Sequence, residues 1–248
     1  MNSPSEPVVL IENLRFAWPG QPCLIALDRL RIAAGEHIFL EGASGSGKST
    51  LLGLLGGVLA PQSGSLHVLG RDLASLRPAA RDRFRADHIG FIFQQFNLLP
   101  YLGLVGNVTL GCRFSARRRQ HLGDTTAIAA EAERLLAALG LDVAQTRDRP
   151  VTGLSVGQQQ RVAAARALIG APELVIADEP TSALDARTRG AFVDLLFEQC
   201  QRAGSTLVMV SHDPALAPMF PRSLELARIN QAPPPDHAGV AATPVRAA

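Results

Sequence analysis

The stretch that most constrains the fold is a glycine-rich loop, GASGSGKST, at residues 42–50. An alternating apolar segment, EHIFLEG, leads into the loop, and a leucine-rich segment, KSTLLGLLGGVL, follows it with the pattern of a helix. The loop fits GxxxxGK[ST], in which backbone N–H groups and a helix N-terminus surround phosphate groups. The sequence therefore predicts a strand–loop–helix unit that holds the phosphates of a nucleotide. Its residues are Gly42, Ala43, Ser44, Gly45, Ser46, Gly47, Lys48, Ser49 and Thr50.

The end of this loop carries the only lysine of the chain. Lysine and arginine together number 24, and Lys48 is the single lysine among them. A compact ammonium suits a narrow backbone cradle better than the broad guanidinium of arginine. We expect Lys48 to neutralise phosphate charge and the hydroxyl of Ser49 to bind Mg²⁺.

A second strand supplies carboxylates. The apolar segment ELVIADEP ends in Asp178 and Glu179. Asp178 is expected to face a metal ion at the edge of the sheet. Side-chain alternation directs Glu179 away from Asp178, toward the rim of the sheet, where it could polarise an attacking water molecule.

The order of the patterns predicts an α/β protein. Alternating segments at residues 8–18 and 23–32 precede the loop, and helical patterns dominate residues 98–170. Strand and helix patterns then resume, ending in a strand near RSLELARI. We therefore expect a β-sheet core interrupted by a helical subdomain at residues 98–170. Residues 231–248 are rich in proline and alanine and are expected to be disordered.

Composition excludes several classes of protein. The chain has 248 residues, 47% of them apolar, and a formal net charge of only +2, so no nucleic-acid partner is expected. No secretory signal is visible, and no apolar run is long enough to cross a membrane. Three widely spaced cysteines, Cys23, Cys112 and Cys200, indicate neither a disulfide framework nor a zinc site. These features predict a soluble, cytoplasmic protein.

A third motif, LSVGQQQR at residues 154–161, places a serine where it could cap a helix. Together with the loop and the Asp178 strand, it resembles the ATP-binding subunits of ABC transporters over residues 8–230, with Val156 where that family commonly has glycine. The resemblance implies a P-loop NTPase fold with a mixed sheet, an inserted helical subdomain and an N-terminal antiparallel part. It also implies that two copies pack head to tail. Ser155, Gly157 and Gln158 of one copy would then contact the γ-phosphate held by the other, with the hydroxyl of Ser155 free to face it.

The same resemblance assigns four further residues. Gln94 in FIFQQF is expected to touch Mg²⁺ and the attacking water, although Gln95 beside it could be confused with it. Asp185 in SALD would lie at the seam between the copies, and His212 in VMVSHD would contact the γ-phosphate. Trp18 stands where the family places an aromatic ring to stack on adenine, but as the only tryptophan it could equally be a core residue.

The function implied is hydrolysis of Mg-ATP that drives transport through separately encoded membrane permease subunits. Glu179 would activate water, His212 would position it, and Lys48 with Mg²⁺ would stabilise charge in the transition state. The subunit would work as a homodimer, or as a heterodimer with another ATPase subunit, on the inner face of the cell membrane. The motifs FNLLP and LSVGQ favour export or the handling of lipids or lipoproteins.

Other readings remain open at this stage. A soluble ABC-type ATPase acting on nucleic acid or ribosomes usually carries coiled-coil arms, zinc modules or two ATPase units, which this chain lacks. A small-molecule kinase would not need LSVGQ, SALD and SHD in that order, and Glu179 with His212 disfavours a regulator that only binds. The arginines at 81, 83, 85 and 117–119 are most simply a solvated face, with contact to anionic lipid or a permease as the alternative.

Overall fold

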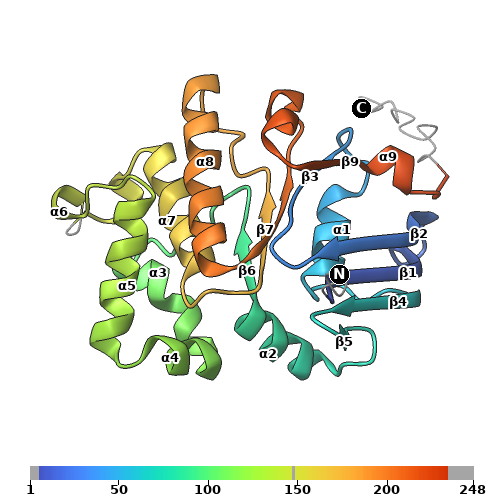
Figure 1. Cartoon of the computed structure of the whole chain (residues 1–248), viewed down its shortest axis with the longest axis horizontal. Coiled ribbons are helices and arrows are strands. Elements are labelled where there is room, and N and C mark those ends of the chain that lie inside the picture. The colour runs from blue at the N-terminus through green and yellow to red at the C-terminus, as the bar shows by residue number, and fades with distance from the viewer. Residues whose placement is uncertain (1–5, 147–148, 234–248) are drawn as a thin grey trace, which may run out of the picture.

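The computed structural model describes residues 6–146 and 149–233, and it contains two β-sheets with helices between and beside them (Figure 1). Four strands form an antiparallel sheet in the order β2-β1-β4-β5. Their bounds are β1 Pro7–Ala17, β2 Cys23–Ala33, β4 Ser63–Val68 and β5 Arg71–Asp72. Alternation along β1 buries Val9 and Ile11 on one face, as expected for a sheet that is covered on one side. An irregularity at Asn13, which has a φ of 51°, lets Leu14 join the same core.

The second sheet has five strands in the order β6-β7-β8-β3-β9, all parallel. Their bounds are β3 His37–Glu41, β6 Ile89–Ile92, β7 Leu174–Asp178, β8 Thr206–Val210 and β9 Arg222–Glu225. Val210 pairs with both Leu40 and Asp178, so the strands end nearly level. Every loop that follows these strands therefore opens at the same edge of the sheet.

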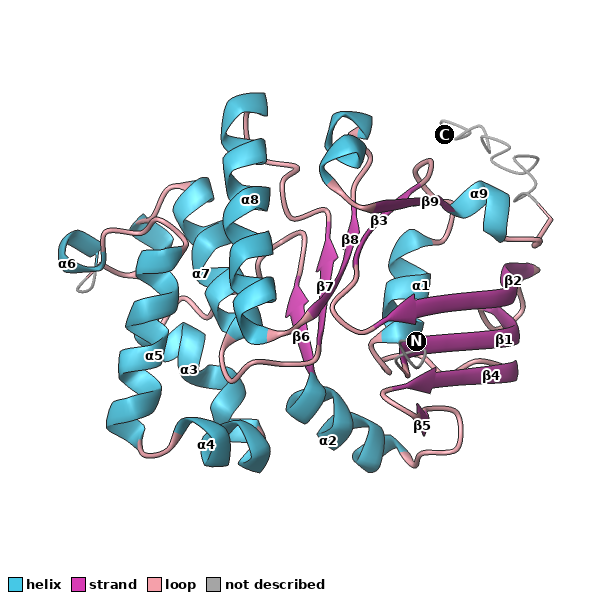
Figure 2. Ribbon diagram, viewed as in Figure 1, coloured by secondary structure: helices cyan, strands magenta, loops and turns pink. Residues whose placement is uncertain are grey.

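One helix, α1 (Lys48–Leu55), lies between the two sheets (Figure 2). Its four buried leucines share a core with the inner faces of the antiparallel sheet and with β3, β7 and β8. The opposite face of the parallel sheet packs against helices from residues 104–203 in a second core. Because both faces are covered, each of the central strands β7 and β8 has four consecutive apolar residues rather than an alternating pattern.

The helices α3 to α7 lie within the range predicted for a helical insert, 98–170. Their bounds are α3 Leu104–Phe114, α4 Ala116–Leu122, α5 Thr125–Ala138, α6 Val143–Thr146 and α7 Val156–Leu168, with a 3₁₀ turn at Val151–Gly153. The helix α8 (Ala186–Ala203) follows β7, and a second 3₁₀ segment, Pro214–Met219, follows β8. The α/β class and the N-terminal antiparallel part are confirmed; the parallel and antiparallel strands fall in separate sheets.

Two elements differ from the sequence prediction. The helix α2 (Pro78–His88) was not expected, because it buries none of its residues and so shows no apolar stripe. The last strand was expected to continue through RSLELARI, but it ends at Glu225. Its partner β3 ends at Glu41, opposite Glu225, where the glycine-rich loop begins. The chain then forms the short helix α9 (Leu226–Ile229).

The predicted disordered tail, 231–248, lies outside the described residues from 234 onward. Among the helices that the structure describes, none has the length and apolar character required to cross a membrane.

The contact between β6 and α7 leads to a stability prediction. A Cβ atom at Gly90 would lie 2.2 Å from the carbonyl oxygen of Ala167, whereas one at Gly190, in α8, would meet nothing within 4 Å. We expect Gly90→Ala to lower the free energy of unfolding by about 1–3 kcal/mol through overpacking. The matched control, Gly190→Ala, should raise it by about 1 kcal/mol because alanine favours helix. Urea denaturation measures both; equal stability of Gly90→Ala and wild type would contradict this close packing.

Candidate functional site

The glycine-rich loop connects β3 to α1 at the edge where the parallel strands end. Gly47, the residue before the helix, has a φ of 97°, and a Cβ there would lie 2.7 Å from Ile25 Cδ1. Only glycine satisfies both the backbone conformation and this close approach to β2. The first turn of α1 has no side-chain cap and no acidic residue. Its backbone N–H groups are therefore available to an anion.

Lys48 is held against the loop itself. Its Nζ atom donates hydrogen bonds to the carbonyl oxygens of Gly42 (2.7 Å) and Ala43 (2.8 Å). The ammonium thus lies over the backbone turn that leads into the N-terminus of α1. This arrangement places one full positive charge and one helix N-terminus around a single small volume.

That volume is a cavity of about 360 Å³. It brings together residues from five separate parts of the sequence, four of them at the carboxyl edge of the parallel sheet. The predicted site residues that line it are Ser44, Gly45, Gly47, Lys48, Ser49, Thr50, Gln94, Asp178, Glu179 and His212. One lining residue, Leu24 at the start of β2, was missed because an apolar strand residue carries no chemical signal.

Asp178 and Ser49 lie side by side in this cavity. Burial raises the pKa of Asp178 above its usual range, and Glu179 raises it further; a hydrogen bond with Ser49 and the charge of Lys48 oppose the shift. A partly buried carboxylate next to a hydroxyl is a suitable pair of oxygen ligands for a hard cation.

Glu179 has an unusual backbone conformation. It leaves β7 with a φ of 49°, in the left-handed region that non-glycine residues rarely adopt, while its N–H still bonds to Val210. Alternation predicts that its side chain points away from Asp178. The structure shows instead that both carboxylates line one cavity, because the left-handed turn redirects the second one.

His212 completes this side of the cavity. Its Nδ1 atom lies 2.8 Å from Oε2 of Glu179. The imidazole is 68% exposed, whereas the carboxyl of Glu179 is only 11% exposed. The histidine therefore forms the outer wall and the carboxylate the inner one.

The structure separates the two adjacent glutamines. Gln94 lines the same cavity as Lys48, whereas Gln95 lines a different cavity beside Thr152 and Gln159. This supports the choice of Gln94 over its neighbour on geometry alone.

The residues present fit a magnesium ion bound together with phosphate. Ser49, Gln94 and Asp178 offer a hydroxyl, an amide oxygen and a carboxylate within one cavity. Within the described residues no group of three or more His, Cys, Asp or Glu side chains could hold a metal by itself. Magnesium sites of this kind use one or two protein carboxylates and take their other ligands from water and phosphate oxygens.

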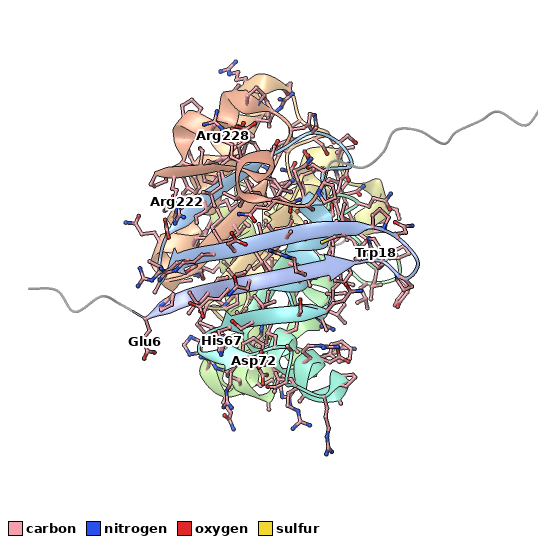
Figure 3. All side chains as sticks on the ribbon, turned by 90° about the vertical axis from the view of Figure 1, so that its right-hand side faces the viewer. Glu6, Trp18, His67, Asp72, Arg222 and Arg228 are labelled. Atoms are coloured by element: carbon pink, nitrogen blue, oxygen red, sulfur yellow. The ribbon has the colours of Figure 1, made fainter. Side chains whose placement is uncertain are left out.

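Trp18 lies at the end of β1, on the antiparallel sheet, where Figure 3 labels it. Its ring packs edge-on against Phe16 at 5.2 Å and remains 40% exposed. It is not a core residue, and it does not line the phosphate cavity. An exposed aromatic face is what stacking on a base requires.

The predicted third motif lies apart from this cavity. Ser155, Gly157, Gln158 and Asp185 are absent from its lining. Ser155 begins α7 in a capping box: its hydroxyl accepts from the N–H of Gln158 (3.3 Å), and the side chain of Gln158 accepts from the N–H of Ser155 (2.9 Å). The hydroxyl was expected to be free. It is already an acceptor here and keeps only its proton to donate.

Asp185 begins α8 in a similar way. Its carboxylate accepts from the N–H (2.9 Å) and the hydroxyl (2.8 Å) of Thr188, and these bonds lower its pKa. The residue is exposed at the surface. Asp185 and Ser155 thus both begin helices outside the cavity that holds Lys48.

The arginine run 117–119 is only partly a solvated face. Arg118 is 3% exposed and donates to the carbonyl oxygens of Ile89 and Ile169, both at 2.8 Å. Burial lowers the pKa of this guanidinium. The expectation of a solvated run is wrong for Arg118, because its partners are far from it in sequence.

Comparisons with known proteins agree with this geometry. A sequence profile described as ABC transporter matches residues 28–182. The macrolide export ATP-binding/permease protein MacB of Rhodopseudomonas palustris (strain HaA2) is 40% identical over 87% of this chain and 32% of its own length. MacB of Sodalis glossinidius is 43% identical over 79% of this chain and 29% of its own length. The chain thus spans about one third of these relatives.

Among solved structures, the dimer of MJ0796, described as a bacterial ABC transporter cassette, superposes with a TM-score of 0.77 at 32% identity. That comparison covers 88% of this chain and 94% of the other. A second dimeric structure of the same cassette, described as a post-hydrolysis state bound to ADP and Pi, superposes equally well over 88% and 93% at 33% identity.

Proposed function

The chain belongs to the ABC transporter family, and on that premise we propose that it hydrolyses Mg-ATP at two sites shared between two copies to drive a membrane permease. The single observation that carries the proposal is the cavity that joins Lys48 and the glycine-rich loop to Asp178, Glu179 and His212. We take residues 8–230 as the ATPase domain, with residues 98–170 as its helical subdomain.

ATP binding rests on the loop and its lysine. The β- and γ-phosphates lie against the uncapped N-terminus of α1, and Lys48 exchanges its two loop carbonyls for phosphate oxygens. The adenine stacks on the exposed ring of Trp18. Ser49, Gln94 and Asp178 hold Mg²⁺, which supplies charge neutralisation at the phosphates when bound.

Hydrolysis requires water to attack the γ-phosphorus as the bond to the β-phosphate oxygen breaks. Glu179 accepts the proton of that water, and its limited exposure keeps the carboxylate from being fully solvated. His212 contacts Glu179 and fixes the position of its carboxylate relative to the γ-phosphate. Lys48 offsets the negative charge that develops on the departing ADP.

The second copy completes the site. The cavity is not enclosed by this chain alone, and Ser155, Gly157 and Gln158 form a helix N-terminus elsewhere on the same chain. In a head-to-tail dimer this helix N-terminus meets the γ-phosphate held by the other copy, and Asp185 lies at the seam. The similar MJ0796 cassettes are described as dimeric, which supports this arrangement.

Two variants separate binding from hydrolysis. Glu179→Gln keeps the loop and Lys48, so we expect ATP affinity to persist, turnover to fall about 100-fold or more, and ATP to induce a stable dimer. Lys48→Ala should weaken ATP binding about tenfold or more, since charge-assisted bonds are worth roughly 1.5–3 kcal/mol. Nucleotide titration, phosphate release and size-exclusion chromatography measure the three effects. Full turnover in Glu179→Gln would refute the assigned base.

We also propose where the permease binds. A second cavity, of about 520 Å³, lies among α2, β6, α3 and α7. It presents the exposed rings of Phe93 and Phe114. Arg85, Arg118 and Arg166 also line it, with guanidinium groups that already donate to backbone carbonyls. Two exposed aromatic rings suit a cytoplasmic helix of a permease that carries an apolar anchor. The relatives named as ATP-binding/permease proteins are about three times as long as the part this chain matches.

Through this groove the subunit would sit on the inner face of the cell membrane. The names of the relatives favour export as the direction of transport. The cargo is selected by the permease.

Phe114 gives a direct test of the groove, because its ring is 72% exposed there. Phe114→Asp should leave basal ATPase activity within about twofold, since surface substitutions usually change little else. It should also release the tagged protein from the membrane fraction of the native host and from the membrane protein that copurifies with it. Val58→Asp is the matched control, at a 55% exposed residue outside the groove. Equal membrane association of both variants would contradict the docking site.

A further inference from the structure

Arg189, near the start of α8, connects two loops of the site that are far apart in sequence. Its Nε atom donates to the carbonyl oxygen of Leu184 (2.9 Å), the residue before Asp185. Its terminal nitrogen pairs with Oδ2 of Asp213, the residue after His212. Both side chains are largely shielded, with exposures of 27% and 21%. One planar guanidinium therefore holds a loop at the expected dimer seam and the loop that carries the histidine.

These contacts form part of a closed ring of interactions that includes Glu179, the proposed general base. His212 contacts the carboxylate of Glu179, and the carbonyl oxygen of Glu179 accepts from the N–H of Ser182 (3.2 Å) in the loop that leads to Leu184. From Leu184 the ring runs through Arg189 to Asp213 and back to His212. Within this ring, Arg189 links the loop at residues 182–185 to the loop that carries His212.

Asp213 is well placed to transmit this constraint. Its Oδ1 atom accepts from the N–H of Ala215 (3.0 Å), and its own N–H donates to the buried Ser211 (3.1 Å). Three interactions therefore hold the carboxylate and backbone of Asp213 in place. Because Asp213 is held in this way, a movement of Arg189 also moves the adjacent His212.

We propose that Arg189 is a positioning residue, which couples the loop at residues 182–185 to His212 and so holds His212 against Glu179 for hydrolysis. The proposal rests on the proposed function. If the partner copy displaces the loop at residues 182–185 when the dimer closes, Arg189 carries that movement to the catalytic base. Neither Arg189 nor Asp213 lines the phosphate cavity, so their loss should affect turnover and not ATP binding.

The test uses Arg189→Ala, Arg189→Lys and Asp213→Asn in the full chain, with steady-state ATPase kinetics. Asp213→Asn keeps an oxygen for Ala215 and removes only the charge that pairs with Arg189. The control is Arg222→Ala. Arg222, labelled in Figure 3, also pairs with one carboxylate (Glu36, 3.0 Å) and one backbone carbonyl (Arg31, 2.9 Å), and its exposure is a similar 38%. It does not line the phosphate cavity.

We expect Arg189→Ala to lower kcat about tenfold while the KM for ATP changes less than about twofold. Asp213→Asn should have a similar effect, and the double variant should be no worse than either single one. Arg189→Lys should restore part of kcat, because an ammonium reaches Asp213 without the second bond to Leu184. Arg222→Ala should leave both kinetic constants unchanged.

Three results would overturn the proposal. The first is a kcat for Arg189→Ala equal to that of Arg222→Ala. The second is a parallel loss of ATP affinity and kcat. The third is additive effects in the double variant. If Arg189→Ala does not fold, Asp213→Asn decides by the same criteria. A wild-type chain without ATPase activity would instead refute the proposed function, so the two failures are distinguishable.

Discussion

The level ends of the parallel strands are the constraint on which the site depends. Because β3, β7 and β8 end within one residue of each other, the loop after β3, the carboxylates after β7 and the histidine after β8 open into one cavity. Packing enforces this register: both faces of the sheet are covered, so a strand cannot slide without exposing apolar side chains. The chemistry at the edge is therefore a consequence of the core beneath it.

Within that edge the residues divide into two groups. One group surrounds Lys48 and can bind phosphate, and the other, at the start of α7 and α8, lies outside the cavity. Each group includes a helix N-terminus, which favours anions, but the start of α7 is closed by its own capping box in the single chain. The bonds between Ser155 and Gln158 satisfy two donors at low cost while no phosphate is present. A phosphate from the other copy would meet the proton of Ser155 and the glycine that follows.

Much of the site could be predicted because its determinants are local. The loop at residues 42–50 needs glycine at a φ of 97°, and the strand before Asp178 is apolar throughout, so both leave clear patterns. The direction of Glu179 could not be predicted, since its left-handed backbone has no sequence signal. The burial of Arg118 depends on the carbonyl groups of Ile89 and Ile169, and the role of Arg189 depends on Asp213. These partners are distant in sequence, and only the fold brings them close. The helix α2 lacks an apolar face, so periodicity could not reveal it.

The central claim is that a single copy holds an incomplete reaction centre. The most direct measurement is the ATPase rate per mole of purified wild-type chain, recorded over a wide range of protein concentration at saturating ATP. The account predicts that this specific rate rises in proportion to concentration when the protein is dilute and levels off as dimers saturate. A specific rate that stays constant down to concentrations at which light scattering detects only monomer would contradict it.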